Sequence, residues 1–236
     1  MGPKEGGQEL SELLQAAAER QTESLRVVIA DDHDLFRTGL RNLLEEQSVQ
    51  IVGEAGTGGD AVRLVRELAP DVVVMDLNMP GMGGVDATRH ITGIAPLTRV
   101  VMLTISDDDS DVMDAILAGA CGYLLKSSSI QELMAGIRAA AQGESLISPT
   151  IAAKVLQRVR ATSTQPEIAN TIRSELSDRE IEVLKLIANG KDNAQIARDL
   201  HISPKTVKNH ISNILMKLQI QNRIQAAVYA VRSGLA

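Results

Sequence analysis

The segment Val72–Met75 is a run of four apolar residues that ends on Asp76. A continuous apolar run rich in β-branched residues predicts a strand buried on both faces, which is typical of a parallel sheet. Pro80 and Gly81 follow shortly after and end the strand. Ligands of open α/β sheets bind at the carboxyl ends of the strands, where this pattern puts Asp76. Taken alone, Asp76 would be interpreted as a turn residue, so its role depends on the rest of the sheet.

Similar apolar runs alternate with helical patterns across residues 25–145. This alternation of five β/α units predicts an α/β fold, a five-stranded parallel sheet with helices on both faces. Two of the helices are predicted from apolar residues that recur at helical spacing, namely Leu35, Phe36, Leu40, Leu43 and Leu44 in one and Val62, Leu64, Val65 and Leu68 in the other.

Three other predicted strands also end in polar or charged residues, which are Asp31 and Asp32 after residues 25–30, Thr104 after residues 100–103, and Lys126 after residues 121–125. If the strands are parallel, these side chains meet Asp76 at one edge of the sheet.

Three carboxylates held together raise one another's pKa unless cations offset their charge. A divalent metal bound by oxygen ligands and the ammonium of Lys126 are suitable cations. This set of groups suits a phosphoryl group on Asp76, because the metal and Lys126 would neutralise its oxygens and Thr104 could donate a hydrogen bond to one of them.

This set of residues, together with Tyr123 and the loop 76–84, resembles the receiver domain of bacterial two-component response regulators. The resemblance implies a flavodoxin-like fold in which Asp76 accepts phosphate from a histidine kinase. It also implies the residues of a metal site and of a phosphate switch: Asp32, Asp76 and the Asn78 carbonyl bind Mg²⁺ with Asp31 beside them, and Thr104, Tyr123 and Lys126 respond to the phosphoryl group.

Two positions depart from the family pattern. Ser127 follows Lys126 where the family commonly has a proline in a cis peptide bond, a geometry that costs a non-proline residue about 3 kcal/mol. Ile105 is bulkier than the small residue that many receivers have after the switch hydroxyl. The first departure bears on the turn after Lys126, and the second on access of small phosphodonors to Asp76.

Charge divides the chain into unlike parts. The net charge is −6, but residues 25–145 contain 9 basic and 18 acidic residues, whereas residues 175–236 contain 9 basic and 6 acidic residues. An acidic first domain and a basic second domain indicate a nucleic-acid partner for the second only.

The second domain is helical in pattern. Ser177 and Glu180 form a capping-box signature, Asn193 starts a short helix, and Ser203 precedes a proline at the start of a longer helix over 204–218. A short helix, a tight turn and a longer helix are typical of a helix-turn-helix. The outward face of the longer helix has three lysines, no acid and several amide or hydroxyl side chains: Lys205, Thr206, Lys208, Asn209, Ser212, Asn213 and Lys217.

These side chains can bond phosphates or base edges, whereas a solvated surface is the alternative interpretation. The motifs also resemble the LuxR-type DNA-binding domain, through Leu176 to Glu180, Gly190, Ile196-Ala197, Thr206 to Lys208 and Lys217-Leu218. With the receiver, this pairing is that of the NarL/FixJ response regulators.

The second resemblance implies a four-helix domain whose third helix enters the major groove. It implies three sets of residues: base contacts from Lys208, Asn209 and Ser212; phosphate contacts from Asn193, Lys205, Thr206 and Lys217; and pairing of two protomers through the last helix, at Arg223, Ala227 and Val228.

The expected organisation is therefore an N-terminal extension over 1–24, a receiver domain over 25–145, a linker with a helix over 146–174, and a DNA-binding domain over 175–236. The extension has one apolar helical stripe, so it is either a frayed tail or a helix that docks on the body or on a second subunit.

The sequence predicts a phosphorylation-switched transcription regulator rather than an enzyme. Its expected partners are a histidine kinase, double-stranded DNA, a second copy of the chain when active and, as a further candidate, RNA polymerase. In the unphosphorylated form we expect the receiver to cover the recognition helix.

Three alternatives remain. A Mg²⁺-dependent phosphatase would use Asp76 as nucleophile, but many such enzymes need a second acid where this chain has Asn78. A ligand-sensing LuxR-type regulator would need an apolar pocket, but the chain has one Phe, two Tyr and no Trp. A receiver that works without phosphate, as a dimerisation platform, is the third.

No apolar run approaches the roughly 18 residues of a membrane span, and the N-terminus lacks the pattern of a signal peptide. Cys121, the one cysteine, lies in an apolar strand and is expected to be a core thiol. We therefore expect a soluble cytoplasmic protein.

Overall fold

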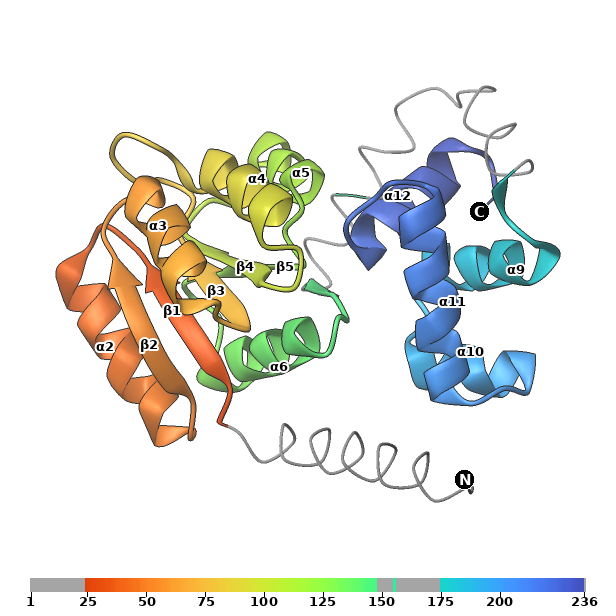
Figure 1. Cartoon of the computed structure of the whole chain (residues 1–236), viewed down its shortest axis with the longest axis horizontal. Helices are drawn as coiled ribbons and strands as arrows, with labels where there is room; N and C mark the ends of the chain where they lie inside the picture. The colour runs from red at the N-terminus through yellow and green to blue at the C-terminus, as the bar shows by residue number, and fades with distance from the viewer. Residues whose placement is uncertain (1–23, 148–154, 156–174, 236) are drawn as a thin grey trace, which may run out of the picture.

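The computed structural model describes residues 24–147, residue 155 and residues 175–235. These residues form a doubly wound α/β domain followed by a helical domain (Figure 1). The N-terminal extension and nearly all of the predicted linker helix lie outside the described residues.

The first domain contains one parallel sheet in the order β2-β1-β3-β4-β5-β6. Its strands are β1 (Arg26–Ala30), β2 (Gln50–Ala55), β3 (Val72–Met75), β4 (Arg99–Thr104), β5 (Gly122–Leu125) and β6 (Leu146–Ile147). The five longer strands confirm the prediction. The two-residue β6 was not predicted; it falls in the segment that the sequence indicated as linker and pairs with the outer edge of β5.

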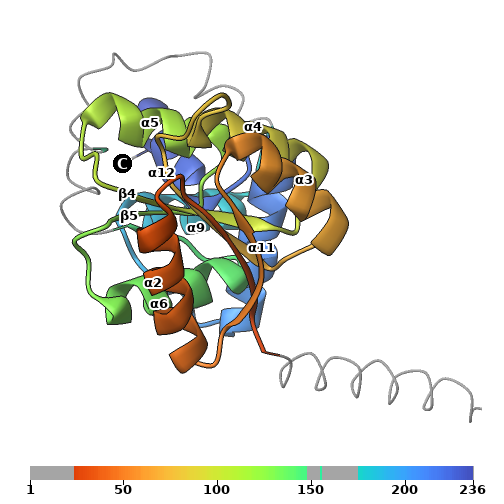
Figure 2. The same ribbon diagram turned by 90° about the vertical axis from the view of Figure 1, so that its left-hand side faces the viewer.

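Helices cover both faces of this sheet (Figure 2). They are α2 (Asp34–Glu46), α3 (Gly58–Leu68), α4 (Gly84–Ile94), α5 (Asp109–Ala118) and α6 (Ile130–Ala141). One apolar core lies between the sheet and α2 with α6, and a second lies between the sheet and α3, α4 and α5. Because β1 and β3 are covered on both sides, every residue of Val72–Met75 is buried, as the apolar run predicts.

The predicted apolar face of α2 is only partly right. Leu40 and Leu44 are buried, but Leu35 is 87% exposed and Leu43 is 47% exposed. At 3.6 residues per turn, Leu35 lies about 140° around the helix from Leu40 and cannot face the same core.

The second domain consists of α9 (Asp178–Ala188), α10 (Asn193–Leu200), α11 (Pro204–Lys217) and α12 (Arg223–Arg232). The predicted capping box of Ser177 and Glu180 is present, and Ser203 caps α11 with proline at its first position. The helices share one apolar core, which includes Val183, Ile196 and Ile214. Across the described part of the chain, no helix has the length and apolar composition needed to cross a bilayer.

The two domains touch through α12 and α5. Ile224 and Val228 of α12 are buried, and they belong to the same apolar cluster as Val112 and Ile116 of α5. Helix α12 therefore packs on the receiver-like domain with one face and on its own domain with another.

Candidate functional site

Asp76 follows β3 directly and is only 5% exposed. Its Oδ1 accepts a hydrogen bond from the Leu77 backbone N–H, and its Oδ2 lies 3.0 Å from the Lys126 ammonium. Gly84 is required beside it, because a Cβ at that position would lie 2.0 Å from the Asp76 carbonyl oxygen. The loop after β3 is thus closed tightly over the backbone of Asp76.

Lys126 bridges two carboxylates from neighbouring strands. Its Nζ lies 2.6 Å from Asp31 Oδ2 as well as 3.0 Å from Asp76 Oδ2. Burial alone would lower the pKa of Lys126, but its hydrogen bonds to Asp31 and Asp76 outweigh that effect and raise the pKa. The ammonium is therefore fixed in its charged form at the floor of the site.

An oxygen-rich group of side chains surrounds this ion pair. Ligand atoms of Asp31, Asp32, His33 and Asp76 lie within 4.8 Å of one another. Such a set of carboxylates suits a hard divalent cation. Asn78, expected to contribute its backbone carbonyl, is exposed in the loop two residues after Asp76.

His33 and Phe36 also belong to this site, although neither was predicted from the sequence to lie there. The His33 ring nitrogen Nδ1 lies 2.8 Å from Asp32 Oδ1, and its backbone N–H donates to Asp31. The Lys126 ammonium lies 4.5 Å from the centre of the Phe36 ring, a cation–π contact. The position of His33 next to the acidic pair was the available signal, whereas no local pattern connects Phe36 to Lys126.

Of the switch residues, Thr104 lies on β4, the strand next to β3, and Tyr123 lies on β5, one strand further from Asp76. Thr104 is fully buried at the end of β4, and its hydroxyl accepts a hydrogen bond from the Ser106 backbone N–H. Tyr123 is also buried, and its hydroxyl donates to the Ser106 carbonyl at 3.0 Å. Burial and then the charge of Asp111 raise the pKa of Tyr123. Thr104 and Tyr123 therefore both bond the backbone of the same loop residue, Ser106.

The two departures from the family pattern have simple geometries. None of the peptide bonds that the structure describes is cis, so the bond between Lys126 and Ser127 is trans. Ile105 is 79% exposed and points away from the core.

Helix α11 has an apolar face that packs inward and a polar face that is exposed. Val207, Ile211 and Ile214 are buried, as predicted. Lys205, Lys208, Asn209 and Ser212 are exposed, and Thr206 is half-buried.

Several of the predicted DNA-contacting side chains already have partners within the chain. The Lys217 ammonium lies 2.7 Å from the buried Glu180 carboxylate in its own domain. Asn193 is buried and donates to Glu144 Oε1, just beyond α6 of the first domain. Lys208 lies 3.7 Å from the same carboxylate oxygen. Glu144 thus contacts two residues that are expected to meet DNA.

The three residues expected at a dimer interface differ in their surroundings. Arg223 donates to Asn193 Oδ1 and to the Lys191 carbonyl within its own domain, and burial lowers its pKa. Ala227 packs on the core of the second domain. Val228 is buried in the cluster shared with α5.

Two amide side chains near the start of α12 bond the C-terminal end of α5. Asn222 Nδ2 donates to the Ala120 carbonyl at 2.9 Å, and Gln225 Nε2 donates to the Ile116 carbonyl at 2.8 Å. The Ile116 carbonyl also accepts from the Gly119 backbone N–H, and Ala120 lies two residues beyond α5, so the second domain adds donors at and just after the end of this helix.

The sheet of the first domain has acidic side chains at one edge, bridged by Lys126, and this domain is joined to a helix-turn-helix domain. Together these features define a DNA-binding protein whose first domain receives a signal. Residues 27–138 match the family model described as response regulator receiver domain, and residues 174–230 match the model of bacterial regulatory proteins of the luxR family.

Relatives match the chain over nearly all of their length. The transcriptional regulatory protein LiaR of Bacillus subtilis is 45% identical over 89% of this chain and 99% of its own. The response regulator protein VraR of Staphylococcus aureus is 38% identical over 90% and 99%. Among solved structures, the response regulator ChrA of a heme-sensing two-component system aligns with a TM-score of 0.50 at 36% identity, over 90% of this chain and 99% of that one.

A structure of two RcsB dimers bound to two parallel DNAs aligns with a TM-score of 0.52 at 25% identity, over 89% of this chain and 99% of that one. The chain belongs to the two-component response regulators with a LuxR-type DNA-binding domain, which confirms the family expected from its sequence. It is a DNA-binding transcriptional regulator.

Proposed function

We propose that Asp76 is the phosphoacceptor, and that its phosphorylation by a histidine kinase controls DNA binding through α11. The observation that carries this proposal is the position of Asp76 at the carboxyl end of β3, bonded to Lys126 and beside Asp31. In the transfer, a carboxylate oxygen of Asp76 forms a bond to phosphorus while the bond between phosphorus and the kinase histidine breaks.

The acidic group fits Mg²⁺, because three of its four members, Asp31, Asp32 and Asp76, offer carboxylate oxygens clustered within a few ångströms. Asp31, Asp32, Asp76 and the Asn78 carbonyl would hold the ion, which supplies positive charge opposite the phosphoryl oxygens. Lys126 contributes a second positive charge from the floor of the site. Hydrolysis of the aspartyl phosphate by the protein itself would reset the switch.

The phosphoryl group would draw the Thr104 hydroxyl toward Asp76. Thr104 now accepts from the Ser106 N–H, and Tyr123 donates to the Ser106 carbonyl. A move of Thr104 therefore shifts the loop between β4 and α5 and changes the bond that holds Tyr123. Helix α5 begins directly after this loop and ends against α12, so the shift has a physical path to the second domain.

The contacts of the second domain support masking in the unphosphorylated form. Glu144 contacts Asn193 and Lys208, and α5 covers Val228. We infer that release from the receiver frees α11 for the major groove and α12 for pairing with a second protomer. Lys208, Asn209 and Ser212 would then face bases, while Asn193, Lys205, Thr206 and Lys217 would hold phosphates. Arg223, Ala227 and Val228 would line the dimer contact.

A regulator of this kind acts on chromosomal DNA, so we place it in the cytoplasm, with RNA polymerase as a further candidate partner. The alternative of a receiver that works without phosphate makes a different prediction, because substitution of Asp76 would then leave DNA binding unchanged.

The deciding experiment is genome-wide DNA occupancy with and without a phosphodonor, for the wild type and Asp76→Ala. We expect the phosphodonor to increase occupancy in the wild type only. Asp114→Ala is the matched control, since Asp114 is exposed on α5 and should leave the response intact. Equal occupancy of the wild type and Asp76→Ala under both conditions would refute the switch.

A further inference from the structure

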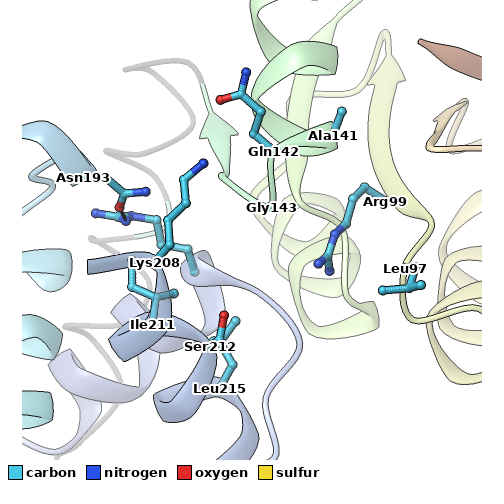
Figure 3. A pocket seen from close by; sticks show the side chains of 11 residues that line it. Leu97, Arg99, Ala141, Gln142, Gly143, Asn193, Lys208, Ile211, Ser212 and Leu215 are labelled. Atoms are coloured by element: carbon cyan, nitrogen blue, oxygen red, sulfur yellow. Dashed lines mark hydrogen bonds between the residues drawn. The ribbon is translucent and has the colours of Figure 1, made fainter. Parts of the chain in front are cut away.

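A cavity of about 290 Å³ lies between the two domains (Figure 3). Arg99, Leu97 and Gln142 line it from the receiver side, and Lys208, Ser212 and Leu215 line it from α11. Its volume is just below the roughly 300–1,000 Å³ that small-molecule sites occupy. The cavity therefore suits a compact ligand.

The cavity has a cationic lining, although the receiver domain that forms half of it is acidic as a whole. Arg99, Lys208 and Arg223 line the cavity and no acidic residue does, although Glu144 contacts two of the lining residues, Asn193 and Lys208. The receiver segment 25–145 as a whole has 18 acidic and 9 basic residues, so a cationic lining is unexpected there.

Arg99 is the least satisfied of these cations. Lys208 has Glu144 nearby, and Arg223 donates to Asn193 and to the Lys191 carbonyl. The Arg99 side chain contacts the Cys121 thiol, and it has no carboxylate partner among the residues that the structure describes. It is half-buried at the start of β4, so its guanidinium has lost part of its hydration without gaining an ion pair.

The remaining lining limits the shape of a ligand. Leu97, Ile211 and Leu215 supply apolar surface, and Gln142 and Ser212 supply hydrogen-bonding groups. A guanidinium binds phosphate through two parallel hydrogen bonds, and two further cations favour a dianion over a carboxylate. A phosphate monoester with a small apolar body combines these properties.

We propose that this cavity is a binding site for a small phosphate monoester, which joins Arg99 of the receiver to Lys208 and Arg223 of the DNA-binding domain. A ligand in this position holds the domains together and occupies Lys208 and Ser212, which are expected to face bases. It is thus an inhibitory input that does not act through Asp76. This effect on DNA rests on the proposed function, whereas binding itself does not.

The expected size of the effect follows from mass action. A ligand that binds only the closed form stabilises it by a factor of one plus the ratio of its concentration to its Kd. At ten times Kd, the apparent Kd for DNA should rise about 11-fold where the closed form predominates.

The binding test is calorimetric titration of the full chain carrying Asp76→Ala, with phenyl phosphate as the probe. Arg99→Gln should weaken binding about ten-fold or more, since it removes a charged hydrogen-bonding group. Arg66→Gln is the matched control, because Arg66 is exposed on α3, away from the cavity, and should leave the affinity unchanged. Lys208→Gln, at an exposed position, gives a second test should Arg99→Gln disturb folding.

Equal affinity of the parent chain, Arg99→Gln and Lys208→Gln would overturn the site. Benzoate binding as tightly as phenyl phosphate would overturn the assignment of a phosphate ligand. The regulatory part is tested by adding phenyl phosphate to wild-type protein and an operator duplex recovered from the occupancy experiment. We expect weaker DNA binding that Arg99→Gln resists; confirmed phenyl phosphate binding with unchanged DNA affinity would overturn the inhibitory role and leave the binding site standing.

Discussion

Glu180 shows how one residue can serve both a helix end and an ion pair. It is 3% exposed, accepts from the backbone and hydroxyl of Ser177, and lies 2.7 Å from the Lys217 ammonium. Burial alone would raise the pKa of Glu180, but the hydrogen bonds from Lys217 and Ser177 outweigh it and lower the pKa.

The lowered pKa of Glu180 in the folded state fixes how its contribution to stability changes with pH. The stabilisation is present above the ordinary carboxyl pKa of about 4.5 and is lost as the pH falls through the folded-state pKa. We therefore expect Glu180→Gln to reduce the free energy of unfolding by about 1–2 kcal/mol at neutral pH. The difference from wild type should shrink in acid. Urea denaturation followed by circular dichroism measures both effects.

Glu182→Gln is the control for this prediction. Glu182 is exposed and pairs with Arg179 on the surface, so its loss should change stability by less than about 0.5 kcal/mol. Equal losses for Glu180→Gln and Glu182→Gln would mean that the buried ion pair is not stabilising.

The elements that carry the interdomain contact are α5 and α12. Gln225 donates to the Ile116 carbonyl, and Asn222 donates to the Ala120 carbonyl. Gln225→Ala removes one of these amide contacts, which is worth about 1 kcal/mol. If the closed form predominates, the unphosphorylated protein should bind operator DNA about five-fold more tightly, as a fluorescence titration would measure.

Gln131→Ala is the matched substitution, because Gln131 is exposed on α6. It should leave DNA affinity unchanged. A Gln225→Ala protein that binds DNA no better than Gln131→Ala would show that the α5–α12 contact does not limit DNA binding.

The helices and strands were predictable where their signals are local. The run Val72–Met75, the capping box of Ser177 and Glu180, and the proline at the start of α11 each depend on a few neighbouring residues, and the structure bears them out. Leu35 was misplaced because apolar character alone does not fix an angle around a helix.

The grouping of Asp31, Asp32, Asp76 and Lys126 was predictable as well, because parallel strands bring their carboxyl ends to one edge. The contact of Glu144 with Asn193 was not, since these residues are 49 positions apart and belong to different domains. No periodic pattern encodes how two domains dock.

If the two domains separate as proposed, the whole molecule becomes larger. A phosphodonor should increase the radius of gyration of the wild type in small-angle X-ray scattering, because the second domain would leave its contact with α5. Asp76→Ala should not respond. Measuring the molar mass of the same samples separates opening from dimerisation. An unchanged radius in phosphorylated wild type would contradict the opening.

Glu144 gives the closed form a thermodynamic consequence for the kinase. Its carboxylate contacts Asn193 and Lys208, so operator DNA that binds these residues as proposed would compete with the receiver for the same two donors. Coupling free energies between sites are reciprocal. Whatever factor phosphorylation adds to DNA affinity, bound DNA must add to the affinity of the receiver for its phosphoryl group. A promoter with a strong operator would therefore favour the phosphorylated state of the regulator bound to it. The affinity of the operators would thus contribute to the sensitivity of the signalling pathway.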